Sequence, residues 1–251
     1  MKNKPSKNWI FIAGPCAAED QAQIMKTAKA LSKIGVPILR AGIWKPRTNP
    51  NDWQGAGDVA LNWMTEAKKK TGILTATEVR DSRTLALAIE SCIDYLWIGS
   101  RNAQNYALLE EVGMATSKSK APVILKRAMS SSLSEWLGSA GYIAKYNSNI
   151  ILCERGIRGY SPDTRNILDL QTAYLAKLQS NYKVIVDVSH AAGRTDLIFP
   201  MSMAVKAAGF DGLMIETHPA PKTAKTDNFQ QVDLKEIKRI FNAVVSFDKL
   251  S

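Results

Sequence analysis

Short apolar runs alternate with longer amphipathic stretches along the whole chain. The apolar runs are rich in β-branched residues and contain few polar positions, which is typical of strands covered on both faces. Such strands belong to parallel sheets with helices packed outside them. The pattern predicts strands over 9–14, 36–42, 72–77, 94–100, 122–127, 149–155, 183–190 and 212–217.

The stretches between these runs repeat their apolar residues at helical spacing. In the first stretch, 20–35, Ile24, Ala28 and Leu31 fall on one face, and Gly35 marks the end of the predicted helix. Segment 52–70 is expected to supply the second helix. The remaining predicted helices cover 81–92, 102–113, 131–144, 166–179, 196–209 and 233–247.

The order of these elements predicts the fold class. Eight strands, each followed by a helix, within 251 residues predict an α/β protein whose single domain, residues 1–251, is a (β/α)8 TIM barrel. A doubly wound open sheet is the alternative arrangement of the same elements. No linker or low-complexity segment divides the sequence, so we expect one domain.

The charge balance limits the classes of partner that the protein is expected to bind. The chain carries 33 lysine and arginine residues against 23 aspartate and glutamate residues, a formal charge of +10. A basic balance favours anionic partners, either nucleic acid or small phosphorylated molecules. The predicted helices mix both signs of charge, whereas a nucleic-acid-binding protein presents a basic stripe or helix face. We therefore expect small anionic substrates and no nucleic-acid partner.

Cysteine usage and hydropathy indicate the compartment. The three cysteines, Cys16, Cys92 and Cys153, show no CxxC spacing, which argues against a disulfide framework or a zinc ribbon. No apolar run approaches the ~18 residues of a membrane span, and the run after the basic N-terminus is too short for a signal peptide. We expect a cytoplasmic protein without a membrane partner, in which Cys92 and Cys153 are buried packing residues.

Cations gather where the predicted strands end. A barrel enzyme builds its active site from the C-terminal ends of its strands. A ring of cations at one small pocket suits the phosphate and carboxylate groups of compact substrates. The cations at the ends of four of the runs are Arg40, Lys45, Arg47, Arg101, Lys126 and Arg155.

Four other residues offer metal-ligating atoms at the same end of the predicted barrel. Cys16 follows the first run, His190 ends the seventh, Glu216 ends the eighth, and Asp227 lies in the loop beyond. One sulfur, one nitrogen and two carboxylates suit a borderline divalent ion such as manganese, iron, cobalt or zinc better than magnesium alone. The sequence therefore predicts one divalent metal ion as cofactor.

Eight ordered segments, each at a predicted strand end, carry a family resemblance. The segments are GPCAAED (14–20), LRAGIWKPRT (39–48), TEVRD (77–81), WIGSRNAQN (97–105), VILKRAMSSS (123–132), CERGIRGY (153–160), VDVSHAAGR (186–194) and IETHPAP (215–221). In these segments the chain resembles the 3-deoxy-D-arabino-heptulosonate 7-phosphate (DAHP) synthases of the compact, single-domain type Iβ. Those enzymes condense phosphoenolpyruvate with erythrose 4-phosphate in the first step of the shikimate pathway.

The resemblance implies a role for each matching residue. The ion, with manganese foremost, would be held by Cys16, His190, Glu216 and Asp227. Phosphoenolpyruvate would be held by Arg40, Lys45, Arg101, Lys126 and Arg155, and erythrose 4-phosphate by Arg47 and Thr48. The candidate catalytic residues are Lys45, Glu154 and His190, and the sequence does not choose among them or exclude a water on the ion.

Three alternatives stay open at this point. The sister enzyme, 3-deoxy-D-manno-octulosonate 8-phosphate synthase, uses arabinose 5-phosphate and carries Lys-Ala-Asn-Arg where this chain has KPRT, so Arg47 and Thr48 favour the four-carbon sugar. A Schiff-base aldolase would use Lys126 as nucleophile. A non-catalytic anion-binding protein would explain the cations but not the four metal-ligating residues.

Three further expectations follow from the resemblance. The family usually has Ser-Asp-Gly where this chain has Thr226, Asp227 and Asn228, so we expect Asn228 at a left-handed turn position, which asparagine tolerates. We also expect a homo-oligomer, either a dimer or a tetramer. Relatives carry a regulatory domain or a fused chorismate mutase, and neither is expected within residues 1–251, so such a partner would be fused to or associated with this chain.

Overall fold

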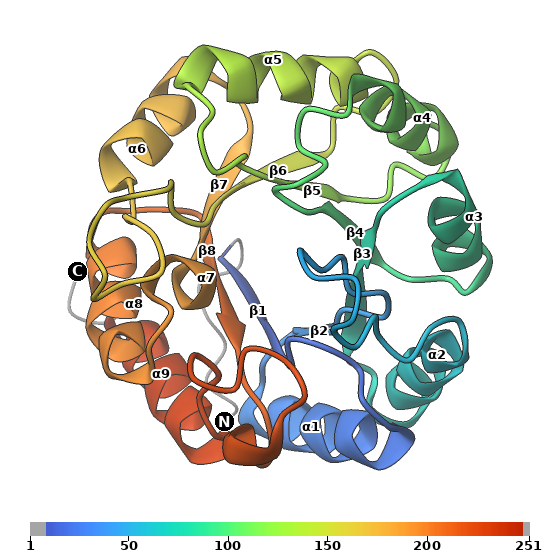
Figure 1. The fold of residues 1–251 in the computed structure, drawn as a ribbon, viewed down its shortest axis with the longest axis vertical. Helices are drawn as coiled ribbons and strands as arrows, with labels where there is room; N and C mark the ends of the chain where they lie inside the picture. The colour runs from blue at the N-terminus through green and yellow to red at the C-terminus, as the bar shows by residue number, and fades with distance from the viewer. Residues whose placement is uncertain (1–8, 248–251) are drawn as a thin grey trace.

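Eight parallel strands close into a barrel surrounded by helices in the computed structural model, which describes residues 9–247 (Figure 1). Each strand pairs with the next in sequence, and β8 pairs with β1 to complete the ring. The predicted (β/α)8 barrel is confirmed, and closure leaves no sheet edge exposed. The strands are β1 (Ile10–Gly14), β2 (Ile38–Arg40), β3 (Leu74–Val79), β4 (Tyr95–Ile98), β5 (Val123–Lys126), β6 (Ile150–Glu154), β7 (Lys183–Asp187) and β8 (Gly212–Glu216).

The helices begin and end at residues suited to those positions. The Asp20 side chain accepts a hydrogen bond from the Gln23 backbone N–H at the start of α1, and Gly35, with φ of 102°, ends that helix. The helices are α1 (Gln21–Ile34), α2 (Val59–Thr71), α3 (Ser82–Glu90), α4 (Tyr106–Thr116), α5 (Leu133–Ala144), α6 (Leu170–Gln179), α7 (Val188–Ala192), α8 (Ile198–Ala207) and α9 (Leu234–Phe247), with 3₁₀ turns η1 (Thr195–Leu197) and η2 (Pro221–Thr223).

One predicted strand is really a strand followed by a helical turn. The apolar run 183–190 ends as a strand at Asp187, because the Asp187 side chain accepts a hydrogen bond from the His190 backbone N–H and starts α7. The turn keeps His190 directly beside the end of β7. The predicted helix within 52–70 begins only at Val59.

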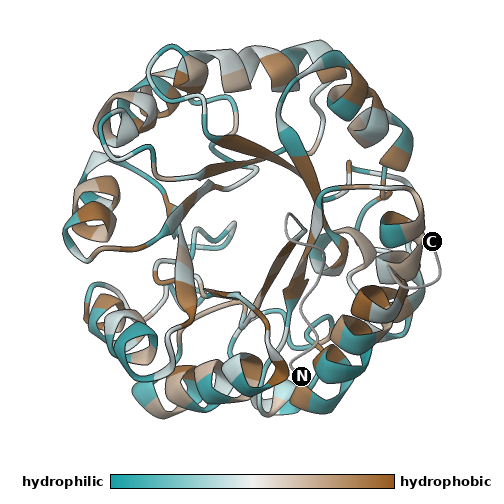
Figure 2. Cartoon of the chain, turned by 180° about the vertical axis from the view of Figure 1, so that it is seen from behind, coloured by the Kyte–Doolittle hydropathy of each residue, from teal (hydrophilic) through white to brown (hydrophobic). Residues whose placement is uncertain are grey.

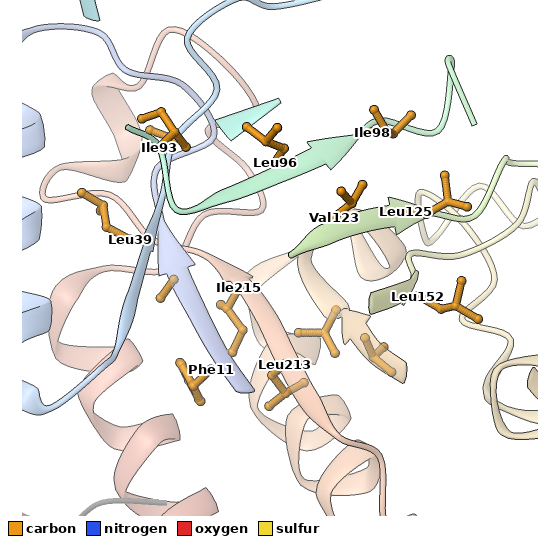
Figure 3. Close-up of a cluster of buried hydrophobic side chains, with 14 of the residues drawn as sticks. Phe11, Leu39, Ile93, Leu96, Ile98, Val123, Leu125, Leu152, Leu213 and Ile215 are labelled. Atoms are coloured by element: carbon orange, nitrogen blue, oxygen red, sulfur yellow. The ribbon is translucent and has the colours of Figure 1, made fainter. Parts of the chain in front are cut away.

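Both faces of the strands are apolar. Outward side chains such as Phe11, Leu39, Leu96 and Leu125 pack under the surrounding helices (Figure 3). Inward side chains form a second, separate cluster inside the barrel, namely Ile10, Ile12, Ile38, Ala76, Trp97, Ile124, Ile151, Cys153, Ile185 and Met214. Figure 2 accordingly shows strongly hydrophobic strands inside a ring of helices of mixed hydropathy.

The inside of the barrel turns from apolar to charged toward the C-terminal ends of the strands. Buried charged residues stand at or next to these ends, namely Arg40, Glu78, Lys126, Arg155, Asp187 and Glu216. Gly14 permits close packing at this level, because a Cβ there would lie 2.0 Å from the Arg40 carbonyl oxygen. The fold thus assembles a charged layer at one mouth of the barrel.

The other expectations about the fold have mixed outcomes. Cys153 is buried as predicted, but the prediction for Cys92 is wrong: it is exposed, because it lies in the surface turn after α3 with φ of 54°. Among residues 9–247, no helix combines the length and the apolar character needed to cross a membrane.

Candidate active site

A pocket of about 380 Å³ opens at the charged mouth of the barrel. Eight cationic side chains line it, against the carboxylates of Asp52, Glu78 and Asp227. All six cations predicted from the strand ends are among them. The eight are Arg40, Lys45, Arg47, Arg101, Lys126, Arg155, Arg158 and Arg165. The excess of positive charge makes this a pocket for anions.

The four predicted metal-ligating residues come together at the edge of this pocket. One donor atom from each of Cys16, His190, Glu216 and Asp227 lies within 4.8 Å of the others. They come from four separate places in the chain: the loop after β1, α7, the end of β8 and the loop before α9. Sulfur, nitrogen and carboxylate oxygen together fit a borderline divalent ion. The chemistry of this donor set therefore fits the predicted cofactor.

Hydrogen bonding prepares His190 as a ligand. Its Nδ1 lies 2.8 Å from Asp187 Oδ2, and its Nε2 lies 3.5 Å from Glu216 Oε1. Burial lowers the pKa of His190 to about 4, so the imidazole is neutral at neutral pH. A neutral imidazole that donates Nδ1–H to a carboxylate presents the Nε2 lone pair, which is the usual arrangement of a metal-binding histidine.

The thiol of Cys16 sits between a cation and an anion. Its Sγ lies 3.0 Å from Lys45 Nζ and 3.2 Å from Asp227 Oδ2. Burial, helped by Glu216, raises the pKa of Cys16 to about 12. Although burial opposes it, His190, Arg165 and Lys45 lower the pKa of Asp227. Without an ion, Cys16 is therefore a thiol beside an ionised carboxylate, and a metal would displace its proton.

Asp187 joins the metal cluster to the anion pocket. Its Oδ2 accepts from Lys126 Nζ at 2.5 Å and from the His190 ring, and it lies 3.6 Å from Arg40 Nη1. Burial alone would raise the pKa of Asp187, but His190, Lys126 and Arg40 hold it well below the usual range. Trp97 supports the two cations from below, with Arg40 Cζ 4.9 Å and Lys126 Nζ 5.7 Å from its ring centre.

Several donors in the pocket are still available to an anion. Arg40 is 1% exposed, yet its Nε and Nη1 have no hydrogen-bond partner among the described residues. Arg101 donates only to Thr48 Oγ1, and Arg155 donates only to the Gly156 carbonyl within residues 9–247. Arg40 and Arg155 are buried, and buried charged donors left without acceptors are costly, whereas Arg101 is exposed. Carboxylate or phosphate oxygens of a substrate would supply those acceptors.

The KPRT turn bridges two parts of the pocket. Arg47 pairs with Asp52 at 3.1 Å, while Thr48 Oγ1 accepts from Arg101 Nη2 at 3.2 Å. Lys45 reaches inward to the Cys16 carbonyl oxygen at 3.2 Å. The turn therefore has one cation at the metal cluster and another at the outer part of the pocket.

Glu154 lies outside the pocket. Its carboxylate accepts from Arg127 Nη1 at 3.1 Å and from the Gly156 backbone N–H at 2.6 Å, on the outer side of β6. Arg127 is held in turn by Asp169 at 2.9 Å. Burial raises the pKa of Glu154 despite these contacts. Its catalytic role stays a prediction, and the position of its side chain does not favour it.

Several residues that line the pocket were not among the predicted site residues, and Glu78, Arg158 and Arg165 are three charged examples. Glu78 is 8% exposed and packs on Gly99, where a Cβ would lie 1.9 Å from Glu78 Oε1. Its place at the end of β3 was a usable signal. Arg158 and Arg165 come from the loop between β6 and α6. Arg158 lies within the segment CERGIRGY but was given no role, and no pattern marked Arg165. The predicted left-handed position at Asn228 is wrong, because the residue with positive φ is Asp227, at 45°.

A parallel barrel with a cation-rich pocket beside a metal-ligating cluster, at the C-terminal ends of its strands, defines a class of enzyme that acts on small anions. A family model described as the DAHP synthetase I family matches residues 5–250. The chain belongs to this family.

Comparison with known proteins supports this assignment. The phospho-2-dehydro-3-deoxyheptonate aldolase of Thermotoga maritima is 42% identical over 233 residues, which cover 92% of this chain and 68% of that protein. A crystal structure of that DAHP synthase superposes with a TM-score of 0.91 at 39% identity, covering 96% of this chain and 70% of the other. A truncated form from Thermotoga maritima gives 0.87 at 37% identity, covering 96% and 87%.

A second group of relatives is more distant. The 2-dehydro-3-deoxyphosphooctonate aldolase of Fusobacterium nucleatum is 26% identical over 269 residues, which cover 97% of this chain and 92% of that protein. The comparison therefore does not favour the five-carbon-sugar alternative over the four-carbon one.

Proposed function

We propose that this chain condenses phosphoenolpyruvate with erythrose 4-phosphate, giving DAHP and phosphate, in the first step of the shikimate pathway. The observation that carries the proposal is the pocket itself, where eight cations surround a space of about 380 Å³ beside four metal-ligating groups. Two polyanions must be brought together against their repulsion, and a ring of cations is suited to that task.

Phosphoenolpyruvate would occupy the deep part of the pocket. Arg40 and Lys126 are buried there over Trp97, and Arg155 is 5% exposed with no carboxylate partner among the described residues. Lys45 and Arg101 complete the proposed set. Together they offer the fixed, charged donors that a carboxylate and a phosphate on a three-carbon frame require.

Erythrose 4-phosphate would bind nearer the opening, at the KPRT turn. Arg47 has 24% of its side chain exposed and, within residues 9–247, is paired only with Asp52, which an incoming phosphate can replace. Thr48 already hydrogen-bonds Arg101 of the proposed phosphoenolpyruvate site. This contact would keep the two substrates in register, with the aldehyde end of the sugar directed to the metal cluster.

The reaction makes one carbon–carbon bond and exchanges the C2–oxygen bond to phosphate for a C2–oxygen bond to water. The C3 carbon of phosphoenolpyruvate attacks the aldehyde carbon of the sugar, whose oxygen takes up a proton. Water adds to C2 and gives up a proton, and phosphate leaves with its bridging oxygen. A divalent ion held by Cys16, His190, Glu216 and Asp227, with manganese proposed, would polarise the aldehyde as a Lewis acid. Lys45 lines the pocket and Glu154 does not, so the position of Lys45 favours it over Glu154 as the proton donor or acceptor.

The test is an assay of metal-stripped protein with phosphoenolpyruvate and each aldose in turn. Loss of the enol absorbance of phosphoenolpyruvate measures the reaction. We expect turnover with erythrose 4-phosphate that depends on added Mn²⁺. Turnover only with arabinose 5-phosphate would overturn the role of Arg47 and Thr48. Turnover that survives thorough chelation, with borohydride trapping of Lys126, would replace the proposal by a Schiff-base aldolase.

Assembly and location are also proposals. We propose a cytoplasmic homo-oligomer, a dimer or a tetramer, which sedimentation of the purified chain would measure directly. A regulatory domain or chorismate mutase, fused or associated, would be a further partner. Addition of the separate mutase to the assay, with a change in turnover or in inhibition by aromatic amino acids, would test that partner.

A further inference from the structure

Two consecutive glutamines lie behind the metal cluster and have no part in the proposed reaction. Gln230 is 0% exposed and Gln231 is 1% exposed. Both belong to the loop between β8 and α9, and neither lines the pocket. A buried side-chain amide needs partners for both its donors and its acceptor. The partners of these two amides are the metal-ligating residues or the segments that carry them.

Gln230 connects the two carboxylates of the cluster. Its Nε2 donates to Glu216 Oε2 at 2.5 Å, and its Oε1 accepts from Arg165 Nη1 at 2.7 Å. The same Arg165 nitrogen lies 3.3 Å from Asp227 Oδ1. This relay runs unbroken from one ligand to the other. It also occupies Glu216 Oε2, so the oxygen that faces His190 is Oε1, which lies 3.5 Å from the imidazole Nε2 and also accepts from Arg40 Nη2 at 3.0 Å.

Gln231 connects the backbones that carry Cys16 and Asp227. Its Oε1 accepts from the Cys16 backbone N–H at 2.9 Å, and its Nε2 donates to the Thr226 carbonyl at 2.7 Å. Thr226 directly precedes Asp227, whose φ of 45° is uncommon for a residue other than glycine. Such a conformation persists when the surrounding structure fixes it from several sides. Gln231 holds the backbone before Asp227 in place by joining the Thr226 carbonyl to the Cys16 backbone N–H after β1.

The glutamines are themselves held by an extension of the sheet. The Val232 N–H donates to the Glu216 carbonyl at 3.0 Å, and the His218 N–H donates to the Val232 carbonyl at 3.0 Å. The chain entering α9 thus runs parallel to the end of β8, with a bridge between Thr217 and Val232. The two neighbouring amides are thereby aimed at different targets, Gln230 at Glu216 and Gln231 at the Cys16 backbone.

We propose that Gln230 and Gln231 are positioning residues that set the geometry of the metal-binding cluster. Gln230 orients Glu216 directly and Asp227 through Arg165, and Gln231 fixes the backbone of Cys16 to the segment that carries Asp227. His190, the fourth member, is oriented by Asp187. Groups that orient metal ligands contribute about 10- to 100-fold to metal affinity. The inference rests on the proposed metal site and adds the residues that preorganise it.

The experiment measures metal binding rather than turnover. Metal-stripped protein is titrated with Co²⁺, following the thiolate-to-metal charge-transfer band, in the presence of a competing chelator. The variants are Gln230→Met and Gln231→Met, which keep length and neutrality but cannot form these hydrogen bonds. Asn147→Leu is the matched control, because Asn147 is a fully buried amide that holds Thr116 Oγ1 and the Ala121 carbonyl, away from the cluster.

We expect each glutamine variant to weaken Co²⁺ binding about 10- to 100-fold. Asn147→Leu should lose thermal stability and bind Co²⁺ like the parent chain. Dissociation constants within twofold of the parent in both glutamine variants would overturn the positioning role and leave the metal site intact. A parent chain that gives no charge-transfer band would overturn the site and the inference together.

If a methionine variant does not fold, a more conservative asparagine variant replaces it. Gln230→Asn and Gln231→Asn keep the amide but are one methylene shorter, so they cannot make the same contacts from the same backbone. Circular dichroism of the metal-free protein establishes folding before each titration. An unchanged dissociation constant in both folded asparagine variants counts against the positioning role as firmly as it does in the methionine variants.

Discussion

The interior of the barrel and its mouth are built from the same strands, but the interior is apolar and the mouth is charged. On β6 the inward residues Ile151 and Cys153 lie in the apolar interior, and Arg155, the next inward position, lines the anion pocket. On β5, Ile124 is followed in the same way by Lys126. One alternation therefore serves stability at depth and substrate binding at the mouth. Function is separated from folding by depth within a strand. A substitution in the apolar interior should therefore lower stability and leave activity unchanged, and a matched substitution at the mouth should lower activity and leave stability unchanged.

The sharpest test of this comparison uses two cysteines. Cys16 and Cys153 are both 0% exposed, and burial raises the pKa of each to about 12, but only Cys16 belongs to the metal-ligating cluster. Cys16→Ala should reduce Mn²⁺-dependent turnover by at least ~10³-fold, because a metal's Lewis-acid effect is worth several kcal/mol. The measurement is turnover at saturating phosphoenolpyruvate and erythrose 4-phosphate, with metal content determined in parallel.

Cys153→Ala is the control for that prediction. It removes one buried sulfur from the apolar interior and should cost about 1 kcal/mol of unfolding free energy. Turnover and metal content should stay at the parent level. Equal loss of activity in both variants would mean that the apolar interior and the mouth are not functionally separate.

Two arginines with opposite orientations give the next largest effect. Arg155 lines the pocket, whereas Arg127 points outward to Glu154 and Asp169. Arg155→Met should lower kcat/KM for phosphoenolpyruvate ~30- to 1,000-fold, since losing a buried charged contact costs about 2–4 kcal/mol. Its melting temperature should stay level or rise, because burial lowers the pKa of Arg155 and so disfavours its charged form.

Arg127→Met should show the reverse. It leaves Glu154 buried without its cationic partner, which costs about 3–5 kcal/mol of stability. Activity per folded molecule should change only severalfold. Denaturant melts and phosphoenolpyruvate kinetics on both variants decide the matter, and a strong kinetic defect in Arg127→Met with normal stability would restore a catalytic role for Glu154.

The pH dependence of metal binding sharpens the description of the mouth. Cys16, with its pKa raised to about 12, is protonated without metal at neutral pH, while His190, with its pKa lowered to about 4, is already neutral. Binding therefore releases one proton between about pH 6 and 9, and affinity should rise about tenfold per pH unit. Indicator titration measures the proton count, and two protons released would contradict the neutral state assigned to His190.

The smallest expected effect lies in the apolar interior. Ile185→Val removes one methyl group from the inward cluster and should cost about 0.5–1.5 kcal/mol of unfolding free energy. Turnover and metal affinity should be unchanged, because the residue lies one inward position below Asp187. A change in either would show that packing at depth controls the charged layer.

The sequence predicted the barrel because its strands are continuous apolar runs, and it predicted the pocket because charges follow them. The continuous apolar character of the strands also explains why the sequence could not show which of Glu154 and Arg155 points into the barrel. When both faces of a strand are apolar, the alternation that would show which face is inward is lost. Two neighbouring charged residues at a strand end then look equivalent, although Arg155 lines the pocket and Glu154 pairs with Arg127.

Loop residues were the other limit. Arg158 and Arg165 reach the pocket from the loop after β6, and their approach depends on tertiary contacts such as that of Arg165 with Gln230. Asp227 adopts the left-handed conformation that was expected of Asn228, because the chain turns at the ligand itself. No local pattern encodes these contacts, whereas the strand-end positions of Arg40 and Lys126 follow from the fold alone.

The single oxygen Asp187 Oδ2 contacts Lys126, the His190 ring and Arg40, so the anion pocket and the metal cluster share an acceptor. If an anion drew Lys126 and Arg40 toward itself, the carboxylate would interact more fully with His190, and the imidazole would become a stronger electron donor. Binding of the proposed metal and of phosphoenolpyruvate would then be thermodynamically linked, and each would change the affinity of the other by the same factor. The coupling between the two sites would then pass through this one carboxylate.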